Sequence, residues 1–462
     1  MFLDGNELAV KTLKWRATLL WGLPTVATLA VSIWLGYLAN TFNLAHGWAI
    51  GWTTALLMLV AAPWKPIVTL GVYILLAYGT PRYGPQHEAL LSLHILDWSV
   101  ALSLTSWLAW RVRTKMDNKC GNWLLFVMLA FVGWVFLSAL FALRAGFPWQ
   151  PLAEHNPTVF LHALILAWIA ASTLKWRSTS WQLPLLAALA VAINALIQGK
   201  GVYLEGDISF LSVIALPLVA LGIWISPNWP MRIGHFIITM GLLYIMLMAQ
   251  NRAAAAGLAA ALIVAWWHLH QRWRILAIGL PFLIATFTLV APQSYLDRFK
   301  VLWDREAHHE TAALDRATVD ERLLLWNAGW QMAKDKPWVG VGVGNYPNTV
   351  VFYLPRLYQG MVTHNSFIQI AAETGFPGLA IYCVLFLGTI AMLQRTIRVT
   401  KEPWRRSTGI AIQTALAGYL IGGIFISRHD LIFSYILIGW AVALCVPVCR
   451  KNLQRIHNVQ HK

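Results

Sequence analysis

Apolar stretches of 17–22 residues recur along almost the whole chain. Each is long enough for a helix to cross the ~30 Å hydrocarbon core of a bilayer. A membrane β-barrel would instead show segments of about ten residues with alternating hydrophobicity. Only 12% of the 462 residues are charged, well below the ~25% of soluble domains. The sequence therefore predicts an all-α polytopic membrane protein.

We expect about 12–14 transmembrane helices. The candidate spans lie near 17–39, 44–62, 66–78, 89–110, 123–143, 158–174, 181–197, 208–225, 233–249, 253–267, 275–291, 374–394, 408–425 and 431–449. The pair 44–62 and 66–78 is also compatible with re-entrant or tilted segments. The map divides the chain into an N-terminal transmembrane bundle at 1–249, a central region at 250–395 and C-terminal helices with a short tail at 396–462.

The net charge of +16 would suggest nucleic-acid binding in a soluble protein. In a membrane protein, Lys and Arg gather in the cytoplasmic connections instead. Alternate connections of this span map hold 22 of the 35 basic residues, and these include both chain ends. The charge excess is therefore a topology signal. It predicts cytoplasmic termini, no nucleic-acid partner and one large outward loop at 292–373.

The outward loop contains a predicted amphipathic helix from Thr318 to Lys336. Thr318 and Glu321 have the spacing of a capping box, and Pro337 would end the helix. Its apolar face would be formed by Leu323, Trp326, Trp330 and Ala333. Such a helix either lies on the membrane surface or packs within an extramembrane lid.

Three glycines follow this helix at alternate positions: Gly340, Gly342 and Gly344. Backbone N–H groups of a glycine-rich turn can bind phosphate. However, the spacing matches neither a P-loop nor GxGxxG. We favour a tight structural turn.

Basic residues in short outward connections are not needed for topology and are candidates for function. Arg252 lies between two consecutive spans, where a guanidinium suits bidentate contact with phosphate oxygens. Snorkelling to lipid headgroups is an equally good explanation. Arg144 presents the same choice, and Arg428 lies in a compact polar trio with His429 and Asp430.

His364 lies where the outward loop re-enters the membrane. An imidazole there suits proton abstraction from a hydroxyl nucleophile, although a hydrogen-bonded structural role is the commoner one. Glu373 is nine residues further along and need not contact it. His94 and Asp97 form a second candidate pair inside a span, for which mutual neutralisation is the simpler interpretation.

Three motifs together resemble the O-antigen ligase and polymerase superfamily. The pattern His364-Asn365, nine residues, Gly375, two residues, Gly378 is similar to the signature of bacterial O-antigen ligases. The stretch ERLLLWNAGWQMAKDKPWVGVGVGNYPN is similar to the segment that precedes that histidine. The QNRAAAAG turn resembles the position of an outward-facing arginine in this superfamily. The resemblance covers roughly 250–395.

The resemblance implies a glycosyltransferase that needs no metal or other cofactor and acts at the periplasmic face of the bacterial inner membrane. It would move a glycan from an undecaprenyl diphosphate carrier to an acceptor hydroxyl, with the lipid A–core sugar as the favoured acceptor. His364 and Arg252 would be catalytic. The predicted substrate-binding residues are Arg144, Asn365, Asn251 and Arg428.

The sequence hardly decides between a ligase and two related transferases, although the His-Asn pattern favours the ligase. An O-antigen polymerase, with a second repeat unit as acceptor, and a protein O-oligosaccharyltransferase, with Ser or Thr as acceptor, share the same motifs. A transporter for lipid-linked glycans would also need arginines for the diphosphate. A large outward loop that ends in the His-Asn motif argues against a transporter.

Overall fold

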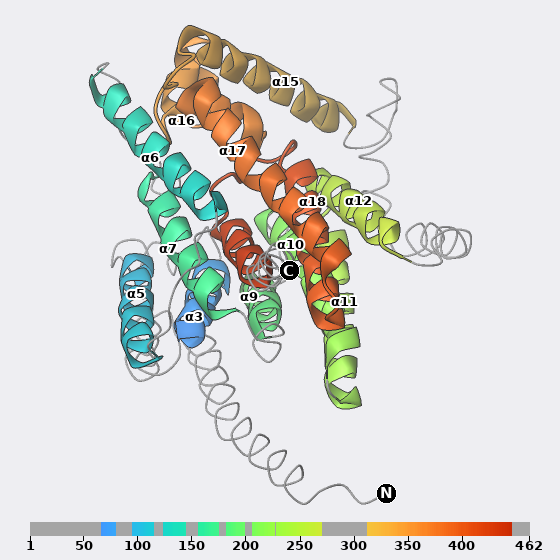
Figure 1. The fold of residues 1–462 in the computed structure, drawn as a ribbon. Helices are drawn as coiled ribbons and strands as arrows, with labels where there is room; N and C mark the ends of the chain where they lie inside the picture. Colours follow the sequence, from blue (N-terminus) through green and yellow to red (C-terminus); the bar gives the residue numbers. More distant parts are fainter. Residues whose placement is uncertain are drawn as a thin grey trace, which may run out of the picture.

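The structure, a computed structural model, describes residues 66–79, 95–114, 123–144, 156–174, 182–198, 206–226, 228–269 and 312–445. These residues form helices, turns and short connections, and no strand occurs among them (Figure 1). The predicted spans near 17–39, 44–62 and 275–291, His94 and both chain ends lie outside the described residues. Every other predicted span overlaps a helix.

The transmembrane part contains α3 (Pro66–Gly79), α5 (Ile95–Thr114), α6 (Trp123–Arg144), α7 (Thr158–Thr173), α9 (Gln182–Gln198), α10 (Gly206–Ile225), α11 (Trp229–Met248), α12 (Arg252–Trp267), α17 (Ser366–Val399), α18 (Pro403–Gly422) and a last helix, Ile432–Cys445. Within the described part of the chain, four segments are long and apolar enough to cross a membrane: Trp123–Ala142, Ile208–Ile225, Trp229–Met248 and Ser366–Val399. Large apolar side chains such as Phe126, Phe236 and Ile263 are exposed on these helices and on α12, as lipid-facing residues are. The predicted all-α membrane fold is confirmed.

Small residues let α12 and α18 pack with their backbones in contact. A Cβ atom at Gly257 would lie 2.7 Å from the carbonyl oxygen of Gly418, and one at Gly422 would lie 3.0 Å from the carbonyl oxygen of Ala253. Helices in membranes associate through such small-residue contacts because lipid supplies no hydrophobic drive between them. This packing fixes the first residues of α12 beside the end of α18.

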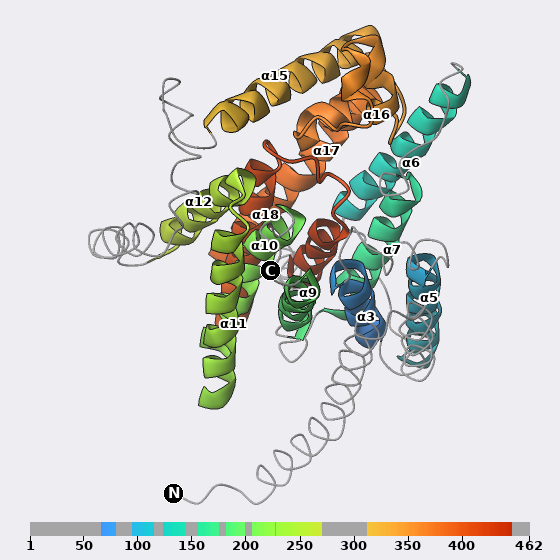
Figure 2. The ribbon, with the colours of Figure 1, turned by 180° about the vertical axis from the view of Figure 1, so that it is seen from behind.

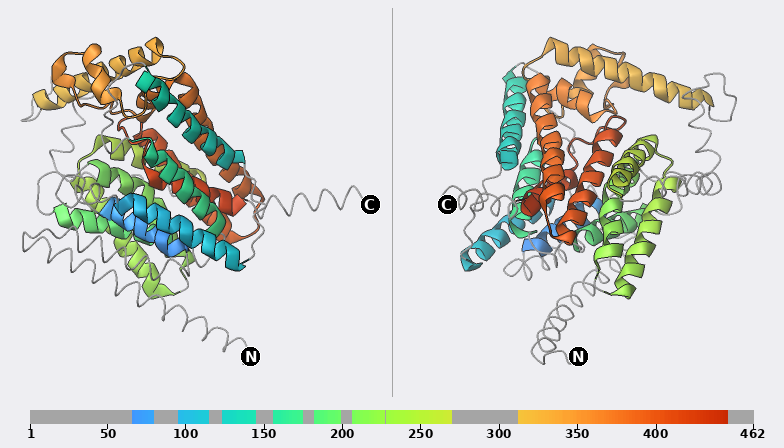
Figure 3. Two further views of the ribbon diagram at one scale, coloured as in Figure 1. Left: turned by 90° about the vertical axis from the view of Figure 1, so that its left-hand side faces the viewer. Right: turned by 45° about the vertical axis from the view of Figure 1, so that its right-hand side comes forward.

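The lid, residues 312–365, lies across one end of the bundle (Figures 2 and 3). It contains α15 (Ala312–Asp335), α16 (Tyr346–Thr349) and the 3-10 turns Val350–Phe352 and Arg356–Tyr358. Its own apolar core joins Leu325, Met332 and Tyr346 to Ala372 of α17. The Tyr346 hydroxyl also donates to the carbonyl oxygen of Leu325 at 2.7 Å. The lid is thus an ordered part of the fold.

Two details of the predicted loop helix are wrong. The helix begins at Ala312, so the Thr318–Glu321 pair lies inside it and is no capping box. Its buried face consists of Leu325, Ala328, Met332 and Ala333, whereas Leu323 is 49% and Trp330 41% exposed. Three consecutive leucines precede Trp326, so hydrophobic periodicity alone does not fix the rotation of the helix. Contacts with Tyr346 and Ala372 select it.

A kink at Gly375 divides α17 where the predicted span 374–394 begins. Gly375 has φ 71°, and Pro377 has no N–H for a helical hydrogen bond. The Phe376 N–H donates to the carbonyl oxygen of Pro337 at 2.8 Å instead of continuing the helix. A Cβ atom at Gly375 would lie 2.4 Å from the carbonyl oxygen of Trp338. The kink therefore requires glycine and joins α17 to the end of α15.

The carbonyl groups at the kink are satisfied by other segments. Ala372 and Glu373 accept hydrogen bonds from the N–H groups of Val341 and Gly342, both at 2.9 Å. The Ser138 hydroxyl of α6 lies 2.7 Å from the Glu373 carbonyl oxygen. Gly340, Gly342 and Gly344 all have positive φ, so the three glycines form the structural turn that we favoured. Because two of its N–H groups bind α17, the turn is poorly suited to hold phosphate.

Replacement of Gly375 by alanine is expected to destabilise the protein. Left-handed backbone costs an L-residue ~1–2 kcal/mol, and the clash with Trp338 adds to this. The melting temperature of the purified protein in detergent should therefore fall. Gly133→Ala in α6 is the control, since no atom lies within 4 Å of a Cβ there and alanine favours helix. Equal melting temperatures of G375A and the wild type would contradict the requirement for glycine at the kink.

Candidate active site

His364 lies on the lid side of α17, directly before its first turn. Its φ is 54°, a left-handed conformation that is uncommon outside glycine. The residues on either side are fixed: the Thr363 hydroxyl accepts the N–H of Asn365 at 3.0 Å and lies 3.0 Å from the Ser427 hydroxyl. Non-glycine residues held in such conformations are concentrated at functional sites. The local structure therefore holds His364 at a defined position.

The start of α12, which carries Arg252, resembles the start of α17. Arg252 is the first residue of α12, and the residue before its N-cap, Gln250, has φ 47°. The Asn251 side chain accepts the N–H groups of Ala253 at 2.8 Å and Ala254 at 3.4 Å. In both places a left-handed residue precedes an asparagine N-cap and a helix. The sequence motifs QNR (250–252) and HNS (364–366) therefore have the same local geometry.

The end of α18 brings these two helix starts together. A Cβ atom at Gly422 would lie 3.0 Å from the carbonyl oxygen of Ala253, and the carbonyl oxygen of Gly423 accepts the N–H of Ser366 at 2.8 Å. The first turns of α12 and α17 therefore lie on either side of a single turn of chain. The partial positive charges of both helix N-termini add to the field at this place.

Arg322 of α15 completes the cluster, and the sequence analysis did not single it out. Burial lowers the pKa of its guanidinium below the usual range, and the positive charge of Arg252 lowers it further. An arginine remains charged despite such a shift. The residue lies in the stretch that carries the family resemblance. Charged residues are common on extramembrane helices, so the sequence alone does not distinguish Arg322 from its neighbours. Only the fold brings its charge within electrostatic reach of both Arg252 and His364.

The His364 imidazole is neutral at physiological pH. Burial lowers its pKa to about 4, and the positive charge of Arg322 contributes to the shift. A neutral imidazole can accept a proton, so His364 is in the correct state for a general base. An anion bound beside Arg322 would offset its charge and raise the His364 pKa towards the ordinary value of ~6.5. The base would therefore become stronger when an anionic ligand is present.

Asn251 and Asn365, predicted to bind substrate, are both helix caps. The Asn365 side-chain oxygen accepts the N–H groups of Phe367 and Ile368, each at 3.0 Å, and the residue is 5% exposed. Asparagine is among the best N-cap residues because its short side chain reaches these N–H groups. The structure thus gives both residues a role in placing Arg252 and His364. Direct substrate contact by either one stays a prediction.

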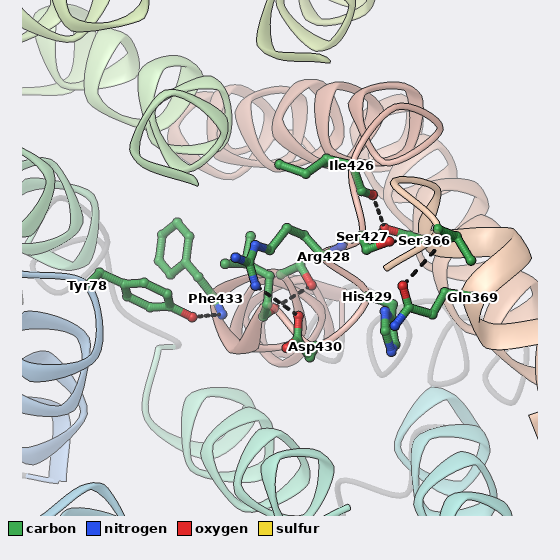
Figure 4. A network of polar contacts seen from close by, with 12 residues as sticks. Tyr78, Ser366, Gln369, Ile426, Ser427, Arg428, His429, Asp430 and Phe433 are labelled. Atoms are coloured by element: carbon green, nitrogen blue, oxygen red, sulfur yellow. Dashed lines mark hydrogen bonds and ion pairs between the residues drawn. The ribbon is translucent and has the colours of Figure 1, made fainter. Parts of the chain in front are cut away.

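Arg428 lies in the connection between α18 and the last helix. Its N–H donates to the Ser366 hydroxyl at 2.9 Å, and its carbonyl oxygen accepts the Tyr419 hydroxyl at 2.9 Å. Its guanidinium lies 4.0 Å from the Asp430 carboxylate and extends away from Ser366 (Figure 4). Its charge is thus balanced by Asp430. The backbone of Arg428 supports the start of α17, whereas its predicted contact with substrate gains no support from this geometry.

A buried acid–base pair lies beneath the start of α17. The Glu373 carboxylate accepts the Gln369 amide at 3.1 Å and lies 3.6 Å from Nε2 of His429. Both residues are at most 1% exposed, and the Gln369 oxygen lies 3.3 Å from the Thr363 hydroxyl. Glu373 therefore has one partner in its own helix, Gln369, and a second, His429, in the connection that follows α18. This network links the α17 kink to the backbone that carries His364.

Asp97 also has a partner from another helix. Its carboxylate lies 3.1 Å from Nε2 of His162 in α7. The suggested partner, His94, lies outside the described residues. The pair links α5 and α7 and is separate from the His364 cluster.

Arg144 is the last residue of α6, and its side chain lies outside the described part of the chain. The end of α6 packs on the glycine turn, because a Cβ atom at Gly342 would lie 2.4 Å from Ala142. Helices α6 and α12 lie on opposite sides of α17 (Figures 1 and 2). The structure does not place the start of α12 beside the end of α6. The predicted cooperation of Arg144 with Arg252 stays a prediction.

The cluster of Arg252, Arg322 and His364 combines two fixed cations with a neutral proton acceptor. Guanidinium groups bind phosphate oxygens in bidentate geometry. Two helix N-termini with oriented N–H groups also favour an anion. The arrangement suits a reaction in which a phosphate leaves and a hydroxyl loses its proton.

Removal of the Arg322 charge should raise the pKa of His364. The rate of hydrogen–deuterium exchange at C2 of each histidine, followed by mass spectrometry, reports this pKa without any activity assay. The pH midpoint of the exchange rate at His364 should be about 4 in the wild type and higher in Arg322→Gln. Arg316→Gln removes a charge from the same helix and should leave the midpoint unchanged. An unchanged pH midpoint in R322Q would show that the charge of Arg322 does not influence the pKa of His364.

Comparison with protein families finds a match in this part of the molecule. Residues 236–383 match the family model described as O-antigen ligase. The matched region runs from α11 through the lid to the middle of α17, and it contains Arg252, Arg322 and His364. No curated protein matches the sequence.

Proposed function

We propose that this chain transfers a glycan from an undecaprenyl diphosphate carrier to an acceptor hydroxyl, because residues 236–383 match the O-antigen ligase family model. The favoured acceptor is the lipid A–core sugar, which makes the reaction O-antigen ligation in lipopolysaccharide synthesis. The reaction would take place at the periplasmic face of the bacterial inner membrane. Both chain ends would then lie in the cytoplasm.

The cluster of Arg252, Arg322 and His364 is the observation that carries this proposal. The two guanidinium groups would bind the diphosphate of the donor and offset the charge that develops as it leaves. Fixed cations in a partly buried place act strongly because little solvent screens them. In this mechanism the arginines supply positive charge at the leaving group, so the reaction is proposed to need no metal.

His364 would act as the general base. The acceptor oxygen would form a bond to the anomeric carbon while the bond from that carbon to the phosphate oxygen breaks. The hydroxyl proton would pass to His364 and the lipid diphosphate would leave with the bonding electrons. Attack from the face opposite the leaving group inverts the anomeric configuration. Because the bound diphosphate raises the His364 pKa, the base is strongest when donor is present.

Acceptor identity separates the related functions. The test is an assay with purified protein, a lipid-diphosphate-linked glycan and three acceptors: lipid A–core, a second lipid-linked repeat unit, and a peptide with Ser or Thr. Product with lipid A–core supports ligation, and product with only the repeat unit or only the peptide supports the polymerase or the protein transferase. Movement of the donor across vesicles without product would support a transporter and contradict transfer.

Replacement of His364 by alanine should abolish transfer. Loss of a general base lowers the rate by ~10²–10⁴-fold. The comparison is the initial rate of product formation at saturating donor. The abundance and melting temperature of the variant should remain those of the wild type, because the substitution removes the proton acceptor and does not affect folding. Full activity of H364A would contradict the assignment of the base.

Replacement of Arg252 by lysine should also reduce transfer, by roughly tenfold or more, because lysine keeps the charge but loses the bidentate fork. The measurement is kcat/KM for the donor. Arg356→Lys is the matched control, since Arg356 is an exposed lid residue. Equal kcat/KM for R252K and the wild type would favour a headgroup-anchoring role for Arg252.

A further inference from the structure

Trp326 is an aromatic residue of α15 whose indole N–H lacks a partner. Its Nε1 is buried and forms no hydrogen bond with any residue that the structure describes. A buried donor without an acceptor costs roughly 1–3 kcal/mol, so such groups are usually satisfied by a ligand or water. The side chain is only partly buried as a whole. It therefore combines a partly open ring with an unused donor.

Trp326 contacts the turn that joins the two helix starts. Its ring centroid lies 6.4 Å from that of Phe425, at an interplanar angle of 42°. The Phe425 N–H donates to the carbonyl oxygen of Gly422 at 2.9 Å, and the next residue, Ile426, accepts the Ser366 hydroxyl at 2.7 Å. Phe425 is 36% exposed despite this firm backbone position. The two rings therefore lie across the place where α12 and α17 begin.

Helix geometry places Trp326 beside the cationic cluster as well. Arg322 and Trp326 are four residues apart on α15, so their side chains lie on one face with Cβ atoms ~5–6 Å apart. This separation is comparable to the width of one sugar ring. Two independent relations, one through Arg322 and one through Phe425, thus put Trp326 at the margin of the proposed diphosphate site.

We propose that Trp326 and Phe425 bind the sugar that is attached directly to the donor diphosphate. The rings offer apolar faces to the C–H groups of the sugar, and the Trp326 N–H donates to one of its hydroxyl or acetamido oxygens. The inference rests on the proposed function. It adds a sugar subsite that selects the donor, since an unpaired indole N–H discriminates against ligands that lack the acceptor oxygen.

The same helix provides an internal control. Trp330, one turn further along α15, forms an edge-to-face pair with Phe376 at 5.7 Å. Trp330 is 41% exposed and packs beside the α17 kink, away from Phe425. The helix thus carries two Trp–Phe pairs, of which only the first lies next to Arg322. Substitution of each tryptophan by phenylalanine removes the N–H and keeps an aromatic ring.

The experiment measures equilibrium binding of two radiolabelled probes to the purified full-length protein in detergent. One is a polyprenyl diphosphate that carries a single N-acetylhexosamine, and the other is the same polyprenyl diphosphate without sugar. Trp326→Phe should weaken binding of the first probe by about three- to tenfold, the value of one neutral hydrogen bond, and leave the second unchanged. Phe425→Leu should show the same selectivity. Trp330→Phe should alter neither.

Other outcomes would overturn the proposal. Unchanged binding of both probes by W326F would show that the N–H has no ligand, and equal weakening of both would show that Trp326 acts on the diphosphate or on the fold. If the wild type binds neither probe, the proposed function itself fails and the sugar subsite falls with it. Normal binding by the wild type with no selective effect in W326F leaves the proposed function intact and removes only this inference.

Discussion

The kink in α17 is the constraint on which the site depends. Left-handed Gly375 and the missing N–H of Pro377 leave carbonyl groups that α17 does not satisfy itself. The glycine turn and Ser138 supply the donors, and Phe376 binds Pro337 in return. Buried carbonyl groups need such partners. The kink thereby fixes the lid on the bundle, and with it the position of Arg322 above the start of α17.

The same organisation concentrates positive charge at one point. Close packing of α12 on α18 places the first turn of α12 by the turn after Gly422, and Ser366 binds the next residue of that turn. Two helix N-termini lie at this turn, and the charge of Arg322 acts on both Arg252 and His364. Burial and the positive charge of Arg322 lower the pKa of the His364 imidazole and keep it neutral. In the proposed mechanism an anionic donor would offset this charge, so donor binding would strengthen the base through electrostatics.

Sequence reasoning located much of this but not all. Arg252 stood out because topology needs no basic residue at its position, and His364 because an imidazole where the loop re-enters the membrane suits proton abstraction. Arg322 did not, because polar residues are expected on an extramembrane helix and its neighbours lie far away in the sequence. The rotation of α15 was assigned wrongly because apolar residues occupy several faces of it. Arg428 stood out as an outward cation, yet Asp430 balances its charge in the folded chain.

The sequence by itself determined the class of fold, the helical spans within the described residues and the segment that carries the family match, because hydrophobic length and short motifs are local properties. Only the tertiary structure decided which charged side chains meet. Contacts such as Glu373 with His429, Asp97 with His162 and Trp326 with Phe425 join helices through side-chain packing. The periodicity of the sequence predicts where a helix forms. The neighbouring segments decide which face of the helix is buried and which residues it contacts.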